Sequence, residues 1–385
     1  MPSFTQDGIT TYYELWGDPS LPRLLVISPS NTPLNQLSPY LSGPGGFAKL
    51  DRHFHCLAYD HRGTGQSSVP APWWPDPPSV GAYANDALAL LSHVGWQRCH
   101  ILAFSFGAAV TQELLLNLSD TSVFRPQRVL LVCPAIDVDG TPSGSYPLEE
   151  LLGLSPAERC ERMLLLADTR RDGYWLESEE GSAAMHYVTH ADSTQRDTPG
   201  GFEGRAYQMV ARRTHATLAR LKAATGGDGG DASAASLPNA ACAPVVASIA
   251  SPKGEEGRLL GDGPPASASA RAYGGAALPP LSEGGVGIFG AVYDAITPPH
   301  ASMRLHGAMR GSQLVWFPTG HWPNLARESR DHFGRATISF LNGKDVPADV
   351  LQASRKAAEE IPKVPIARTF GGGGDCNCLG ACAIS

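Results

Sequence analysis

The sequence has little charge and no long apolar run. Charged residues make up 17% of its 385 residues, and 30 Lys and Arg stand against 37 Asp and Glu, which gives a formal net charge of −7. No stretch is dense in Lys or Arg, so we expect no nucleic-acid partner. No apolar run approaches the roughly 18 residues that a transmembrane helix needs. The first residues also lack the cationic start and apolar segment of a secretory signal, so we expect the chain to be kept in a reducing compartment.

Recognisable metal-ligand patterns are also missing. His186 and His190 lie four residues apart and would share one face of a helix, but no third ligand accompanies them. Five of the eight cysteines are scattered without a repeated spacing: Cys56, Cys99, Cys133, Cys160 and Cys242. The sequence therefore predicts neither a metal site nor an organic cofactor.

Short apolar runs that alternate with helical segments predict the fold class. Such runs are typical of strands buried on both faces of a parallel sheet, and their alternation with helices is typical of a doubly wound α/β fold. A hairpin strand is predicted over 9–16, and helices over 82–94, 108–118, 298–310 and 322–341. The predicted buried strands are 24–28, 55–60, 100–104, 128–133, 286–290 and 313–317.

Composition divides the chain into five parts. Residues 1–136 and 285–342 carry the alternating pattern and form the two halves of the predicted core. Residues 137–224 have Leu, Met, Tyr and Ala at helical spacing, which predicts an inserted helical cap. Residues 225–284 are rich in Gly, Ala, Ser and Pro with few large apolar side chains, so we expect a disordered insertion. Residues 343–385 are predicted to form a helix near 347–360 and a flexible tail.

Ser105 is the candidate nucleophile. The segment Ala103-Phe104-Ser105-Phe106-Gly107 lies where a predicted strand meets a predicted helix, and it is a relaxed form of the G-x-S-x-G elbow. Small residues two before and two after the serine are needed because the turn brings the backbone close to neighbouring strands. The competing interpretation is that Ser105 only caps the helix.

Two later segments supply a base and an acid for this serine. Asp294 follows one late strand and His321 follows the next, so the chain order is Ser, Asp, His. A serine hydroxyl needs a base within hydrogen-bond reach, and the base needs a carboxylate that fixes its tautomer. Asp137, just after the strand at 128–133, is the alternative acid.

Together these motifs resemble the α/β-hydrolase superfamily, and bacterial enol-lactonases, esterases and cofactor-free haloperoxidases in particular. The matching segments are 60–67 (Asp-His-Arg-Gly-Thr-Gly-Gln-Ser), the serine elbow, the Asp-x-x-Thr-Pro-Pro segment at 294–299 and Gly320-His321. The resemblance implies an α/β-hydrolase fold with helices on both faces of the sheet and an oxyanion hole formed by the N–H groups of Phe106 and Ser30. Where the family usually has His-Gly after its first buried strand, this chain has Ser28-Pro29, which alters the oxyanion loop.

The function that these residues predict is a serine hydrolase. It would cleave a carboxylic ester, lactone or thioester of a small or lipid-like molecule through an acyl-enzyme; haloperoxidase-like or acyl-transfer chemistry would use the same residues. The alternative is a receptor or scaffold with this fold that binds a small molecule and turns it over little.

The last residues predict a lipid anchor. Cys382-Ala383-Ile384-Ser385 matches a C-a-a-X prenylation box, in which a final Ser favours farnesyl. One lipid chain holds a protein only marginally, so palmitoylation of Cys376 or Cys378 is the expected second anchor. These features imply a protein prenyltransferase as partner and a place on the cytoplasmic face of a membrane in a eukaryotic cell, or otherwise in the cytoplasm.

Overall fold

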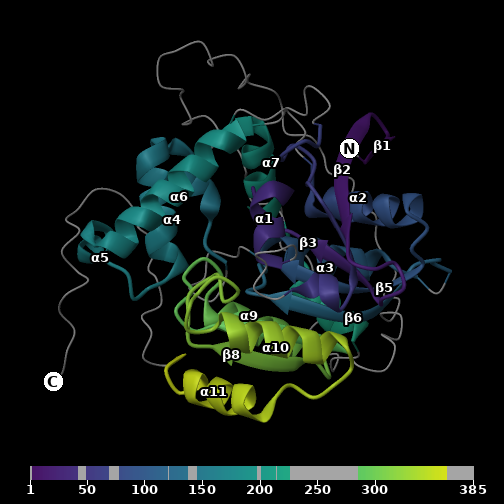
Figure 1. Cartoon of the computed structure of the whole chain (residues 1–385). Coiled ribbons are helices and arrows are strands. Elements are labelled where there is room, and N and C mark those ends of the chain that lie inside the picture. Colours follow the sequence, from purple (N-terminus) through teal and green to yellow (C-terminus); the bar gives the residue numbers. More distant parts are fainter. Residues whose placement is uncertain are drawn as a thin grey trace.

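An eight-stranded, mostly parallel sheet forms the centre of the computed structural model (Figure 1). The structure describes residues 2–41, 49–68, 78–119, 121–137, 145–196, 201–213, 215–225 and 285–361. The strands are β1 (Ser3–Gln6), β2 (Ile9–Trp16), β3 (Arg23–Ile27), β4 (His55–Tyr59), β5 (Arg98–Phe104), β6 (Arg125–Val132), β7 (Val286–Ala291) and β8 (Gln313–Phe317).

The strand order places the loops that carry the candidate residues side by side. The order in the sheet is β1-β2-β4-β3-β5-β6-β7-β8. The six neighbouring strands β4-β3-β5-β6-β7-β8 pair in parallel. Strand β2 pairs antiparallel with both β1 and β4. Because β5, β6, β7 and β8 are adjacent and parallel, the loops after their carboxyl ends gather at one edge, where ligands bind in folds of this type. The mostly parallel sheet was predicted from the short apolar runs.

Helices cover both faces of the sheet, as predicted. One apolar core cluster joins one face to α2 (Val80–His93), α3 (Phe106–Asn117) and α9 (Pro299–Ala308). A second cluster joins the other face to α1 (Leu34–Leu41), α10 (Arg330–Leu341) and α11 (Ala348–Ala358). The two clusters explain the apolar runs in the central strands, since neighbouring positions of a strand contribute side chains to opposite faces.

Between β6 and β7 the chain forms the helices that lie beside this core. They are the short η2 (Leu148–Gly153), then α4 (Pro156–Ala167), α5 (Gly173–Glu177), α6 (Glu179–Arg196), α7 (Gly201–Arg213) and α8 (Leu218–Ala224). Helices α4, α5 and α6 stand together at one side of the molecule (Figure 1), whereas α8 packs against α3 and α9 of the core. Ser155 begins α4 through a capping box with Glu158.

Three details differ from the sequence prediction. The helix predicted over 322–341 begins only at Arg330, because turns that start at Trp322 and a hydrogen bond from Ser329 Oγ to the carbonyl of Pro323 occupy the preceding residues. Helix α1 and strand β1 were not predicted.

Several predictions concern residues outside the described ranges. They include almost all of the proposed insertion at 225–284, with Cys242, and the tail that carries Cys376, Cys378 and Cys382. Within the described ranges, none of the helices is long and apolar enough to cross a membrane.

Candidate active site

Ser105 stands on a strained turn between β5 and α3. Its φ of 50° and ψ of −111° lie outside the regions that a residue with a Cβ ordinarily adopts. The surrounding backbone holds it there: Ser105 N–H donates to the carbonyl of Val132 at 2.9 Å, and Ala135 N–H donates to the carbonyl of Ser105 at 3.1 Å. The turn therefore directs the serine side chain away from the strand and toward the carboxyl edge of the sheet.

Gly107 allows this turn to sit against the neighbouring strand. A Cβ at position 107 would collide with the carbonyl oxygen of Ile27 and lie 2.7 Å from that of Ser28. These carbonyls mark the end of β3, so helix α3 begins in direct contact with the oxyanion loop. The small residue that the elbow motif requires is thus needed for close approach.

Asp294 and His321 form a buried hydrogen-bonded pair. Asp294 Oδ2 lies 2.7 Å from His321 Nδ1, and the two residues are 1% and 6% exposed. Asp294 Oδ1 accepts the N–H groups of Ile296 at 2.8 Å and Thr297 at 3.0 Å, and Thr297 Oγ1 donates to Oδ2 at 2.7 Å. The Asp-x-x-Thr segment therefore surrounds the carboxylate with hydrogen-bond donors, which fix its orientation toward the imidazole.

The alternative acid, Asp137, is engaged elsewhere. Its Oδ1 accepts the N–H of Thr217 at 2.8 Å, next to α8. The structure thus brings Asp294, and not Asp137, into contact with His321. The bond at Nδ1 leaves Nε2 as the ring nitrogen that can exchange a proton with a hydroxyl.

Ser105 and His321 share one cavity of about 740 Å³ with Ser30 and part of the cap. No hydrogen bond directly joins the Ser105 hydroxyl to His321 in the described part of the chain. Such bonds are often long in ligand-free enzymes and tighten when substrate binds. The cavity volume is of the size that accommodates a small organic molecule.

Of the two predicted oxyanion donors, Ser30 lines this cavity, and Phe106 directly follows Ser105, which also lines it. Phe106 is the first residue of α3, so its N–H has no acceptor within the helix, and Ser30 is in the loop after β3. His61 Nε2 lies 3.0 Å from the carbonyl oxygen of Ser28 and holds the start of this loop. Burial lowers the pKa of His61 to about 4, so the ring is neutral near pH 7.

A cap residue that the sequence did not single out holds the other end of the oxyanion loop. Gln208 Oε1 on α7 accepts the N–H of Asn31 at 2.8 Å, and Gln208 Nε2 donates to Thr64 Oγ1 at 2.6 Å. Gln208 thus joins the loop after β3 to the turn after β4. No local pattern distinguishes this glutamine from others on a polar helix.

The end of α4 is hydrogen-bonded to both the acid loop and the base loop. Leu166 accepts the N–H of Ala295 at 2.9 Å, and Ala167 accepts the N–H of His321 at 2.6 Å. Thr169 N–H donates to the carbonyl of Tyr293 at 2.8 Å. The cap therefore contacts the backbone on either side of Asp294 as well as His321 itself.

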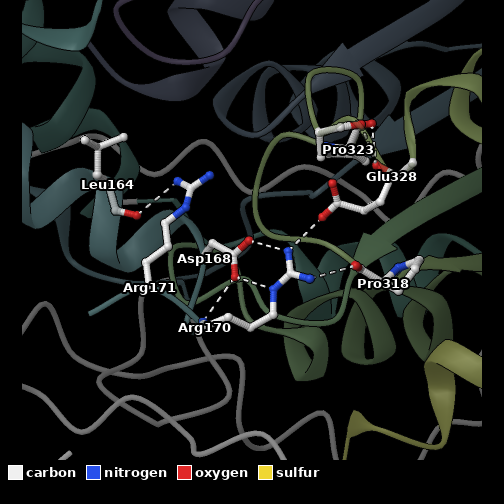
Figure 2. A network of polar contacts seen from close by, with 9 residues as sticks. Leu164, Asp168, Arg170, Arg171, Pro318, Pro323 and Glu328 are labelled. Carbon is white, nitrogen blue, oxygen red and sulfur yellow. Dashed lines mark hydrogen bonds and ion pairs between the residues drawn. The ribbon is translucent and has the colours of Figure 1, made fainter. Parts of the chain in front are cut away.

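A charged network reinforces this contact, and Figure 2 shows Arg170 between Asp168 and Glu328. Arg170 binds the Asp168 carboxylate with Nε at 2.9 Å and a terminal nitrogen at 2.6 Å, and the same nitrogen lies 2.9 Å from Glu328 Oε1. Its guanidinium also stacks 4.5 Å from the ring centroid of Tyr293. The network ties the cap to the segments that carry the acid and the base.

A substitution at Gly320 tests how much the contact between the end of α4 and the His321 loop contributes to stability and activity. A Cβ at position 320 would collide with the carbonyl oxygen of Ala167 and lie 2.7 Å from Cβ of Asp168. Gly320→Ala should therefore separate the cap from His321, lower the free energy of unfolding by about 1–3 kcal/mol and reduce turnover. Urea denaturation and an ester assay measure the two effects. Gly307→Ala is the control, since an added Cβ on this exposed turn of α9 meets no atom of the described residues within 4 Å. Equal losses in both variants would contradict the prediction.

The protonated thiol of Cys133 makes this site a poor metal site. Ligand atoms of Cys133, Asp294 and His321 lie within 4.8 Å of one another. Burial, followed by the charge of Asp294, raises the pKa of the Cys133 thiol, and metals bind the thiolate. The Asp294–His321 hydrogen bond already occupies the other two ligands. His186 and His190 lie on the exposed side of α6.

Comparison with known proteins agrees with this architecture. A family model described as alpha/beta hydrolase fold matches residues 43–134. A putative carbamate hydrolase, RutD, from Caulobacter sp. is 34% identical over 125 residues, which cover 31% of this chain and 41% of the relative. RutD from Pseudomonas syringae pv. syringae is 36% identical over 94 residues, which cover 23% of this chain and 34% of the relative. The matched region thus spans about two fifths or less of these curated relatives.

Solved structures match over a larger part of the chain. The enol-lactonase from Burkholderia xenovorans LB400 has a TM-score of 0.59 at 16% identity, covering 89% of this chain and all of that chain. The meta-cleavage product hydrolase CumD from Pseudomonas fluorescens IP01 has a TM-score of 0.57 at 17% identity, covering 89% of this chain and 97% of that chain. The chain therefore has the α/β-hydrolase fold, as its sequence predicted.

Proposed function

We propose that this protein is a serine hydrolase that cleaves an ester-like bond, such as that of a carboxylic ester, lactone or thioester. The observation that carries the proposal is the Asp294–His321 hydrogen bond of 2.7 Å in a cavity that Ser105 also lines. A strained serine turn at a helix start, next to a buried Asp-His pair, supplies the three groups that acyl transfer through a covalent intermediate needs.

In the proposed mechanism the Ser105 hydroxyl attacks the carbonyl carbon while His321 Nε2 takes its proton. Asp294 keeps the proton of His321 on Nδ1 and stabilises the imidazolium that forms. The N–H groups of Phe106 and Ser30 stabilise the oxyanion. His321 then protonates the leaving alcohol or thiol, and a water activated by His321 releases the acyl group from Ser105.

The second candidate function is a small-molecule receptor with little turnover. The altered oxyanion loop favours it, because Ser28-Pro29 replaces the usual His-Gly and the loop is held from the cap by Gln208. A receptor would bind its ligand in the same cavity and would not need a reactive Ser105.

The two functions are separated by reactivity toward a fluorophosphonate probe and by a substrate panel. The panel contains short and long acyl esters, a lactone, a thioester and a carbamate, the last because two matched relatives are named putative carbamate hydrolases. We expect stoichiometric labelling and turnover of at least one ester-like compound. Failure of labelling together with no turnover across the panel would favour the receptor.

Membrane attachment through Cys382 is a separate proposal that rests on the terminal Cys-Ala-Ile-Ser sequence. Lipid-anchored protein should lack the last three residues and carry a farnesyl group, and palmitate on Cys376 or Cys378 would make the attachment stable. The measurement is the intact mass of the protein purified from a eukaryotic cell. A mass that retains Ser385 with Cys382 unmodified would end this proposal.

A further inference from the structure

His61 contacts both sides of the proposed oxyanion hole. It lies in the turn after β4 and is completely buried. Its Nε2 lies 3.0 Å from the carbonyl oxygen of Ser28 in the loop after β3. Its ring meets the ring of Phe106, the first residue of α3, at a centroid distance of 5.4 Å and an angle of 75°. One side chain therefore connects the loop that carries Ser30 with the helix start that carries the N–H of Phe106.

The imidazole of His61 makes its hydrogen bond through one of its two nitrogens. A carbonyl oxygen can only accept, so the proton of the neutral ring is on Nε2, which donates to Ser28. Nδ1 is buried and has no hydrogen-bond partner in the described part of the chain. Burial of an unpaired ring nitrogen is unfavourable, and a phenylalanine could pack in the same aromatic surroundings without it. The imidazole therefore differs from an apolar ring chiefly in its bond to Ser28.

Pro29 transmits this bond to Ser30. The carbonyl oxygen that accepts from His61 belongs to the Ser28–Pro29 peptide, so the hydrogen bond fixes the orientation of that peptide. The pyrrolidine ring holds φ of Pro29 at about −65°, so only its ψ can still rotate before the peptide group that carries the N–H of Ser30. A glycine at this place would leave φ free as well. The Ser28-Pro29 pair that stands where His-Gly is usual is therefore suited to a rigid donor at Ser30.

The residue after Ser30 is held from the same turn. Asn31 N–H donates to Gln208 Oε1 at 2.8 Å, and Gln208 Nε2 donates to Thr64 Oγ1 at 2.6 Å. Thr64 N–H in turn donates to the carbonyl of His61 at 2.9 Å. Ser30 thus lies between two hydrogen-bonded neighbours, and both of their bonds lead back to the turn after β4.

Aromatic contacts hold the Phe106 side of the hole. The side chains of His61, Phe106 and Tyr83 on α2 are completely buried. The ring of Tyr83 lies 5.8 Å from that of His61 and 5.1 Å from that of Phe106, and all three pairs of rings meet edge to face. Contacts of this geometry are favourable beyond the area that they bury. The start of α3 and the loop after β3 therefore contact the same buried imidazole.

We propose that His61 is a positioning residue that sets the separation of the two oxyanion donors, Phe106 N–H and Ser30 N–H. This inference rests on the proposed function. His61 would not touch the substrate and would act through the loop after β3. Donors aimed at a developing oxyanion act mainly in the transition state, so a displaced donor should lower kcat and leave KM nearly unchanged.

Two substitutions separate the hydrogen bond from the packing. His61→Gln can place its amide nitrogen where Nε2 lies, because both side chains have the same number of bonds between Cα and that nitrogen, whereas His61→Phe keeps a ring and cannot donate. With an activated ester, His61→Phe should lower kcat by about 10- to 100-fold and keep KM within about threefold, since a donor is displaced and not removed. His61→Gln should keep kcat within about fivefold of the wild-type value.

His100→Phe is the matched control. His100 on β5 is also buried, its ring meets that of Phe54 edge to face at 5.9 Å, and it does not line the described cavity. This variant should keep both kcat and KM. If His61 only packed, His61→Phe would stay active and His61→Gln, which has no ring, would lose more. Equal losses in the two His61 variants, or no loss in His61→Phe, would overturn the proposal.

A measurement without substrate distinguishes failure of this inference from failure of the proposed function. Amide hydrogen exchange over residues 28–32 reports how firmly the loop after β3 is held. Exchange there should be at least about fivefold faster in His61→Phe than in wild type or His61→Gln, while exchange in α10 stays the same. Faster exchange in His61→Phe, together with no ester hydrolysis by the wild type, would retain the anchor at Ser28 and reject the hydrolase. Unchanged exchange would reject the anchor.

Discussion

Replacing Ser105 with alanine should lower kcat for the best ester substrate by at least about 10³-fold. The loss follows because the variant has no nucleophile, and only the oxyanion donors and substrate binding would contribute residual catalysis. The fold should persist: alanine keeps the Cβ, and the turn at position 105 is set by backbone hydrogen bonds to β6 and the loop after it. Fluorophosphonate labelling and steady-state turnover measure the loss, and circular dichroism checks the fold.

Ser302→Ala is the matched control for this variant. Ser302 is 1% exposed on α9, its hydroxyl has no hydrogen-bond partner among the residues that the structure describes, and it does not line the described cavity. Removing this hydroxyl should leave labelling and kcat unchanged. If the Ser105→Ala protein were labelled as fully as the wild type, Ser105 would not be the nucleophile.

The second large effect is expected at Asp294. Asp294→Asn keeps the volume and can still accept the N–H groups of Ile296 and Thr297, but the amide no longer stabilises an imidazolium or fixes the tautomer of His321. Losses of about 10⁴-fold in kcat accompany this change in a Ser-His-Asp triad. Single-turnover and steady-state assays with an activated ester measure it.

Asp137→Asn is the control that the structure offers. An asparagine at position 137 can still accept the N–H of Thr217, so kcat should stay within a few-fold of the wild-type value. A larger loss in Asp137→Asn than in Asp294→Asn would assign the orienting role to the earlier carboxylate.

The local patterns predicted the sheet and the serine turn well because both depend on nearby residues. A strand buried on both faces needs an unbroken apolar run, which is why β3 to β8 were predicted close to their observed bounds. The predictions were less accurate where tertiary contacts determine the conformation of the backbone. The segment after Trp322 has a helical pattern, yet it forms turns next to the His321 loop, and the helix begins only at Arg330.

The contacts between the cap and the candidate active site could not be predicted from the sequence either. The helical nature of the cap was visible in the spacing of apolar residues. The contacts of Leu166, Ala167 and Gln208 with the loops of the candidate site were not, because they join segments far apart in the chain through backbone groups or a single amide.

The sequence by itself determined the α/β architecture, the serine elbow and the candidate acid and base, because strand burial, turn strain and motif order are properties of short segments. The tertiary structure decided which carboxylate reaches His321, how the oxyanion loop is held, and which charges face the cavity. These depend on distances between side chains that lie on separate strands and helices, and only the packing of the whole chain sets those distances.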